Sequence, residues 1–151
     1  MVNVFITILE NKIFLSAGLA WLIAQVLKII FYASKHRRIN FKLLLGSGGM
    51  PSSHSSTVMA LCTAVGKVEG WDTSIFIVSL IFSIIIMTDA VGVRRAVGQQ
   101  AQILNIMVDE LYEKGTISER RLKELLGHTP VEVFVGAGIG ILVALWLTGV
   151  N

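Results

Sequence analysis

TSIFIVSLIFSIIIMTDAV, residues 73–91, is an almost unbroken apolar segment. An α-helix that crosses a bilayer needs about 20 mainly apolar residues, and this segment has that length and composition. Over the whole chain, 54% of residues are hydrophobic, 15% are charged, and the mean hydropathy is +0.72. These values are far from the balance of a soluble domain, so the sequence predicts an integral membrane protein.

Three further apolar segments can form membrane helices, at residues 13–33, 54–68 and 131–147. The second is short, so we expect a tilted or partial crossing that its neighbours cover. The last contains small residues that let another helix approach closely, namely Gly136, Gly138 and Gly140. The sequence therefore predicts an all-α bundle of about four membrane helices, which forms a single membrane domain over residues 1–151.

A polar insertion at residues 92–127 separates the last two of these helices. Residues 94–113 carry apolar side chains near helical spacing, and Gly115 breaks that pattern. Ser118 is expected to cap a second short helix at residues 119–126. Together these features predict a helical hairpin at the membrane interface.

The distribution of charge between the loops predicts the orientation of the bundle. Glu69 and Asp72 dominate the loop after the second helix, whereas the loop after the first is basic, with Lys35, Arg37, Arg38 and Lys42. The positive-inside rule therefore places residues 35–50 and 92–130 in the cytoplasm. If the second helix crosses, its start, the end of the third helix and the start of the fourth meet at this cytoplasmic face. In a membrane protein, the net charge of +3 reflects the basic residues of the cytoplasmic loops. It does not indicate a nucleic-acid partner, and the sequence has no RNA- or DNA-binding motif.

The stretch GGMPSSHSS, residues 48–56, combines a turn, a helix start and an imidazole. Pro51 has a backbone conformation suited to the first turn of a helix, and Gly49 lets the backbone approach a ligand closely. Backbone N–H groups and hydroxyls at such a helix start, including those of Ser52 and Ser53, suit an anion such as phosphate. His54 is placed to give or take a proton.

A second polar cluster, GHTPVEV at residues 127–133, marks the start of the last membrane helix. His128 and Glu132 are four residues apart, so they share a face if the helix already includes His128. The carboxylate can then orient the imidazole by bonding one ring nitrogen. Two histidines at helix starts on one face, close to Arg94 and Arg95, indicate phosphoryl transfer.

These motifs resemble those of known families. PSSH at 51–54 and HTPVEV at 128–133 resemble the second and third motifs of the type 2 phosphatidic acid phosphatase (PAP2) superfamily, which includes vanadium haloperoxidases. The chain resembles the bacterial divergent PAP2 family more narrowly, over AQVLK at 24–28, GGMPSSHSS at 48–56, DAVGVRR at 89–95, QAQILN at 100–105 and LGHTP at 126–130. This narrower resemblance covers nearly the whole chain.

The resemblance implies catalytic roles for three residues. In the parent superfamily the third-motif histidine attacks phosphorus and becomes a phosphohistidine, which assigns His128 as the nucleophile. Glu132 stands in place of the usual Asp and would orient His128. His54 would be the general acid that protonates the leaving group.

The resemblance also implies a group of cations that binds the phosphate oxygens. Lys28, together with Arg37 or Arg38, could supply the first-motif cations. Leu122 occupies the usual place of the third-motif arginine, so the candidates for that role are Arg94 and Arg95. The proline that usually closes the first motif is missing as well. These departures affect the phosphate site more than the two histidines.

We therefore predict a PAP2-like phosphatase of the bacterial cytoplasmic membrane that needs no metal or cofactor. It would act on a lipid phosphate or a prenyl diphosphate through a phosphohistidine, with its active site on the cytoplasmic face and membrane lipids as its partners. Two alternatives stay open. One is a non-catalytic protein that binds or transports a lipid phosphate, and the other is a scaffold whose glycine-rich last helix mediates homo-oligomerisation.

Several of these residues also have plainer explanations. Lys28 can reach the membrane interface with its long side chain, although a lysine within a span is a functional-site candidate by default. Arg37 and Arg38 can serve only as topology determinants and contacts to lipid headgroups. His54 and His128 can simply be polar residues at helix starts.

Overall fold

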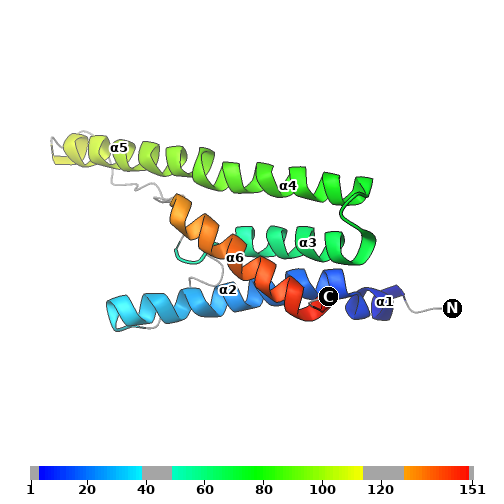
Figure 1. Ribbon diagram of the computed structural model, residues 1–151. Coiled ribbons are helices and arrows are strands. Elements are labelled where there is room, and N and C mark those ends of the chain that lie inside the picture. Colours follow the sequence, from blue (N-terminus) through cyan, green and yellow to red (C-terminus); the bar gives the residue numbers. More distant parts are fainter. Residues whose placement is uncertain (1–3, 39–48, 114–127, 150–151) are drawn as a thin grey trace.

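The computed structural model describes residues 4–38, 49–113 and 128–149 as a set of helices. These are α1 (Val4–Glu10), α2 (Lys12–His36), α3 (Ser53–Glu69), α4 (Ser74–Val91), α5 (Val93–Glu113) and α6 (Pro130–Thr148). Four of them, α2, α3, α4 and α6, form the bundle in Figure 1. The predicted all-α bundle of about four helices is confirmed.

Polar side chains set where each of the bundle helices begins. The side chain of the residue before each helix accepts a hydrogen bond from a backbone N–H of the first turn, at Asn11, Ser52, Thr73 and Thr129. The helices consequently start within a few residues of the predicted limits. One local expectation was wrong: α3 begins at Ser53 behind the Ser52 cap, so Pro51 precedes the helix and does not form its first turn.

Three of the helical stretches are long and apolar enough to cross a membrane, at Lys12–Ser34, Ser74–Asp109 and Pro130–Thr148. The remaining bundle helix, α3, has 17 residues and packs against α2, α4 and α6. Most of its residues are buried, as expected for a short helix covered by its neighbours. The outward side chains of α4 are large and apolar, which suits contact with lipid; they include Ile75, Val78, Ile81 and Phe82.

The closest helix packing in the described part of the chain is between α3 and α6. A Cβ atom at Gly136 would overlap the carbonyl oxygen of Ser52, and one at Gly140 would overlap that of Ser56. The two backbones therefore meet where α6 has no side chains, a common arrangement for membrane helices. Gly138 has open space where its side chain would be, so only two of the three glycines serve this crossing.

The rest of the core is also made of small side chains. Ala20 of α2, Ala60 and Ala64 of α3, and Ala144 of α6 are fully buried. Serine hydroxyls add bonds between helices: Ser56 Oγ donates to the Ala20 carbonyl oxygen (3.0 Å), and Ser83 Oγ donates to that of Val58 (3.0 Å). These bonds join α3 to α2 and to α4.

The bundle brings four helix ends together. α2 and α4 end, and α3 and α6 begin, on the left side of Figure 1. This is the arrangement expected from four crossings, and it brings both histidine motifs to one end of the molecule. That this end faces the cytoplasm stays a prediction.

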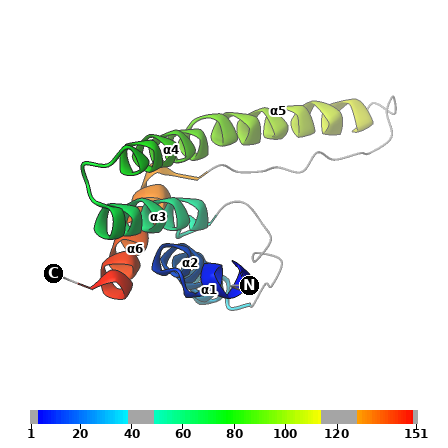
Figure 2. The ribbon, with the colours of Figure 1, turned by 90° about the vertical axis from the view of Figure 1, so that its right-hand side faces the viewer.

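Beyond this end, α5 continues in line with α4 and projects past the bundle (Figures 1 and 2). Its bounds, Val93–Glu113, confirm the first helix of the predicted hairpin. The second predicted helix, at residues 119–126, and the turn at Gly115 lie outside the described residues.

We predict that the α3–α6 crossing does not tolerate a methyl group at Gly140. Gly140→Ala should lower the thermal unfolding midpoint of the detergent-solubilised protein, because overpacking a filled contact costs about 1–3 kcal/mol. Gly138→Ala is the matched control, and it should leave the midpoint unchanged or raise it, since alanine favours helix over glycine by up to about 1 kcal/mol. Equal midpoints for the two variants would contradict this packing.

Candidate active site

The two histidines singled out in the sequence lie next to each other. His54 is in the first turn of α3, and His128 lies two residues before the start of α6. Their ring centroids are 6.4 Å apart, with the rings edge to face at 63°. His128 is 1% exposed, whereas His54 is exposed. The fold thus brings together two imidazoles from motifs that are far apart in the sequence.

A backbone hydrogen bond ties these two motifs to each other. The N–H of Ser52 donates to the carbonyl oxygen of Glu132 (3.0 Å), so the residue that caps α3 is bonded to the first turn of α6. Gly136 packs against the same stretch of backbone one turn further along α6. The distance between the histidines is therefore set by main-chain contacts.

Glu132 holds His128 in a different way from the one expected. The sequence analysis placed both residues on one helical face, but α6 begins at Pro130, so His128 lies outside the helix. Thr129 is the N-cap: its Oγ1 accepts from Glu132 N (3.4 Å), and its N–H donates to Glu132 Oε2 (3.0 Å). This capping box turns the carboxylate back toward the residue before the cap.

The same carboxylate oxygen contacts the ring of His128. Glu132 Oε2 lies 3.1 Å from His128 Nδ1. An ionised carboxylate can only accept, so the proton of this bond is on Nδ1, and the lone pair of the neutral ring is then on Nε2. An imidazole held in this tautomer is prepared to act as a nucleophile through Nε2.

The serines proposed as phosphate ligands lie in the buried start of α3. Ser52 is fully buried, and its Oγ accepts from Ser55 N (3.4 Å) and from Ser55 Oγ (3.0 Å). Ser53 is 4% exposed. The Ser52 hydroxyl therefore has a capping function in the fold, whatever it contributes to a ligand.

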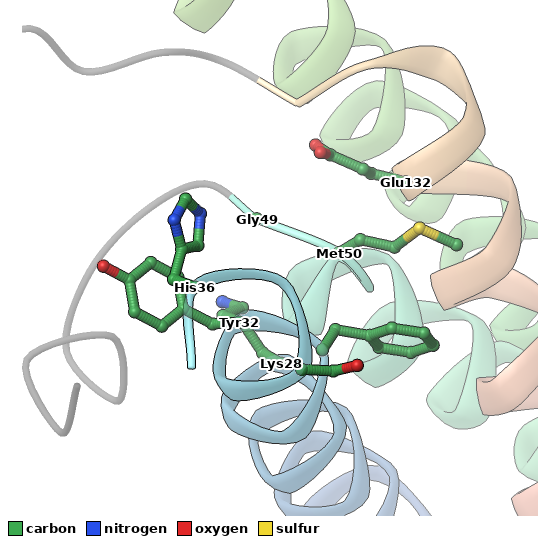
Figure 3. Close-up of a pocket in the computed structure, with 8 residues that line it drawn as sticks. Lys28, Tyr32, His36, Gly49, Met50 and Glu132 are labelled. Carbon is green, nitrogen blue, oxygen red and sulfur yellow. The ribbon is translucent and has the colours of Figure 1, made fainter. Parts of the chain in front are cut away.

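A pocket of about 480 Å³ opens beside the histidine pair, between α2, α6 and the residues before α3 (Figure 3). It is lined by Lys28, Phe31, Tyr32, Ser34, His36, Gly49, Met50 and Glu132. Gly49 has a φ of 88°, which favours glycine, and a Cβ atom there would lie 3.4 Å from Lys28 Cγ. Lys28, Gly49 and Glu132, all predicted site residues, thus share one pocket.

The sequence analysis predicted no site role for five of the lining residues, Phe31, Tyr32, Ser34, His36 and Met50. Two of these, Tyr32 and His36, have rings that carry polar groups. They follow Lys28 at intervals of four, so all three lie on one face of α2, and the rings of Tyr32 and His36 are 4.5 Å apart. Figure 3 shows them on the α2 side of the pocket, with Glu132 projecting from the α6 side. The regular spacing from Lys28 was the signal that could have identified them.

The four predicted arginines lie at the end of α2 and at the start of α5. Arg37 ends α2 in a left-handed conformation, and both Arg37 and Arg38 are exposed and do not line the pocket. Arg94 and Arg95 lie in the first turn of α5, which among the described helices packs only against α4. Within the described ranges, no three His, Cys, Asp or Glu residues are grouped as metal ligands.

The fold and the site together define a multi-pass helical membrane protein with paired histidine motifs at one end of its bundle. The chain belongs to the divergent PAP2 family, whose model matches residues 9–143 and so includes both motifs. It is similar to the uncharacterized membrane protein YuiD of Bacillus subtilis (strain 168), with 42% identity in an alignment that covers 93% of this chain and 96% of that protein. No solved structure matches the chain.

We predict that Glu132 fixes the tautomer of His128. In protein labelled with ¹⁵N-histidine, NMR at neutral pH should show His128 protonated at Nδ1, because Glu132 accepts that proton, and His128→Ala identifies the signal. Glu132→Ala should change the signal to a mixture of tautomers, and Glu69→Ala, at the other end of α3, should not. A His128 ring protonated at Nε2 in the unmodified protein would contradict this geometry.

Proposed function

We propose that the protein is a membrane phosphatase that hydrolyses a lipid phosphate or a prenyl diphosphate through a phosphohistidine at His128. The main support for this proposal is that His54 lies next to His128 and that the Glu132 carboxylate contacts Nδ1 of His128. One imidazole is arranged as a nucleophile and the second lies beside it, which is what a two-step displacement needs.

In the first step, His128 Nε2 attacks phosphorus while the bond between phosphorus and the leaving oxygen breaks. His54 gives its proton to that oxygen, so the alcohol or phosphate leaves in a protonated form. In the second step, water attacks the phosphohistidine, His54 takes a proton from this water, and the bond between phosphorus and Nε2 breaks. Glu132 stabilises the positive charge that develops on the His128 ring in the first step.

Cations near the histidines would stabilise the charge of the phosphate groups. Lys28 is the cation that best fits this role, because it lines the pocket beside Glu132. Gly49 offers a backbone that a ligand can approach, and Ser52 and Ser53 lie at the adjoining helix start. We retain Arg37, Arg38, Arg94 and Arg95 as residues that could contact phosphate oxygens once a lipid is bound.

The position of the site in the bundle supports a lipid as the substrate. The histidines lie where membrane helices begin and end, and the surrounding helices expose large apolar side chains. With the basic loops on the cytoplasmic side, the enzyme would act on lipids that are made on that leaflet.

A second candidate is a protein that binds or transports a lipid phosphate without hydrolysing it. The observation that favours it is the burial of His128, which is 1% exposed and so must be reached through a change of the site. The departures from the parent motifs, Glu132 for Asp and Leu122 for arginine, point in the same direction.

Phosphate release tests this proposal. The detergent-purified protein is incubated without added metal with phosphatidate, phosphatidylglycerol phosphate and prenyl diphosphates. We expect release by the unmodified protein, complete loss in His128→Ala, and a decrease of about 10²–10⁴-fold in His54→Ala, which lacks the general acid. Lys12→Gln, at the far end of α2, is the control and should keep full activity.

Two results would contradict the phosphatase proposal. Release that persists in His128→Ala would exclude the phosphohistidine. If no substrate releases phosphate while the unmodified protein and His128→Ala both bind lipid phosphate, the binding or transport protein is supported instead.

A further inference from the structure

Lys28 is the most unusual charged residue in the described part of the chain. It lies inside the candidate span Lys12–Ser34, and its side chain is 2% exposed. Among the described residues, the carboxylate that acts on its ammonium group is that of Glu132. A charge buried in a membrane helix is costly unless an anion compensates it, so this lysine indicates an anion-binding site.

Glu132 is the described residue that compensates the charge of Lys28. Glu132 lines the same pocket and attracts the ammonium group electrostatically. Its Oε2, however, already accepts from His128 Nδ1 and from Thr129 N. A ligand anion in the pocket would therefore add a second negative charge close to the Lys28 ammonium group, beside that of Glu132.

The pocket is distinct from the place where the reaction would occur. Neither His54 nor His128 lines it, although His128 contacts the lining residue Glu132. Nδ1 of His128 contacts Glu132, which belongs to that wall, and Nε2 is the ring nitrogen assigned to the reaction. A group bound in this pocket would thus contact Lys28 and Glu132 rather than the two histidines.

The other lining residues indicate what kind of group the pocket accepts. The Tyr32 hydroxyl and the His36 ring can donate hydrogen bonds to an anion, and they follow Lys28 along one face of α2. Phe31 and Met50 add an apolar wall. A volume of about 480 Å³ is in the range of small-molecule sites and has room for a phosphate and the chain next to it.

We propose that this pocket binds a second, non-reacting phosphate, so that the preferred substrates are lipids with two phosphate groups close together. This proposal rests on the proposed function, because the histidine pair acts on the other phosphate. A diphosphate on a prenyl chain and a phosphodiester that carries a terminal phosphomonoester share this chemistry. A lipid with one phosphate would leave Lys28 without a ligand anion.

Binding to pairs of lipids with matched tails tests the proposal independently of turnover. Calorimetry with the full chain in nanodiscs compares farnesyl diphosphate with farnesyl phosphate, and dioleoyl phosphatidylglycerol phosphate with dioleoyl phosphatidate. We expect the lipid with two phosphates to bind more tightly in at least one pair. Lys28→Gln should weaken binding of that lipid about 10- to 100-fold, the effect of a hydrogen bond to a charged group, and should leave its single-phosphate partner within about 2-fold. Lys28→Arg should keep the preference.

Two further variants distinguish a loss of binding from a folding defect. Lys12→Gln removes a lysine from the exposed start of the same helix and should change no affinity. Tyr32→Phe removes only a hydroxyl, and it should weaken binding of the two-phosphate lipid about 2- to 10-fold at an unchanged unfolding midpoint. If Lys28→Gln does not fold, Tyr32→Phe provides the test.

The outcomes separate this proposal from the phosphatase proposal. A two-phosphate preference that depends on Lys28, without phosphate release, supports the pocket and contradicts the phosphatase. Suppose that the protein releases phosphate and that Lys28→Gln weakens the binding of both lipids of a pair equally. This result overturns the pocket proposal, because Lys28 then contacts the reacting phosphate. No preference in either pair also overturns it, and the pair that does show a preference identifies the lipid class.

Discussion

The close crossing of α3 and α6 is the contact on which the rest of the structure depends. Two glycines, Gly136 and Gly140, let the backbones meet, and the Ser52 N–H donates to the Glu132 carbonyl oxygen at the end where both helices begin. Because this bond joins the cap of one helix to the first turn of the other, the residues beside it, His54 and His128, are placed relative to each other by main-chain geometry. Glu132 is part of this contact through its backbone, and through its side chain it orients His128.

Much of the architecture could be predicted because it depends on local signals. Apolar segments of sufficient length identified α2, α4 and α6, and the residues that cap them, such as Thr73 and Thr129, precede those segments directly in the sequence. The two histidine motifs were also visible, since each lies at a polar boundary of an apolar segment. Their arrangement at one end of the bundle followed from the order and number of crossings.

The remaining features depend on contacts that the sequence does not display. The partnership of His128 and Glu132 was expected from helical spacing, yet it arises from a capping box because α6 begins after His128. The pocket combines one face of α2 with Gly49 and Glu132, so Tyr32 and His36 gain a possible function only after the helices are packed. The direction of α5, in line with α4, likewise depends on tertiary structure rather than on its amphipathic pattern.

The central claim is that His128 is a nucleophile, and trapping the phosphorylated enzyme tests it most directly. The protein is mixed with farnesyl diphosphate labelled with ³²P in the terminal phosphate, quenched in alkali within milliseconds to seconds, and digested for mass spectrometry. We predict an acid-labile, alkali-stable phosphoryl group on the peptide that contains His128, and none in His128→Ala. Release of labelled phosphate with the phosphoryl group on another residue, or with no labelled protein at any time, would contradict the account.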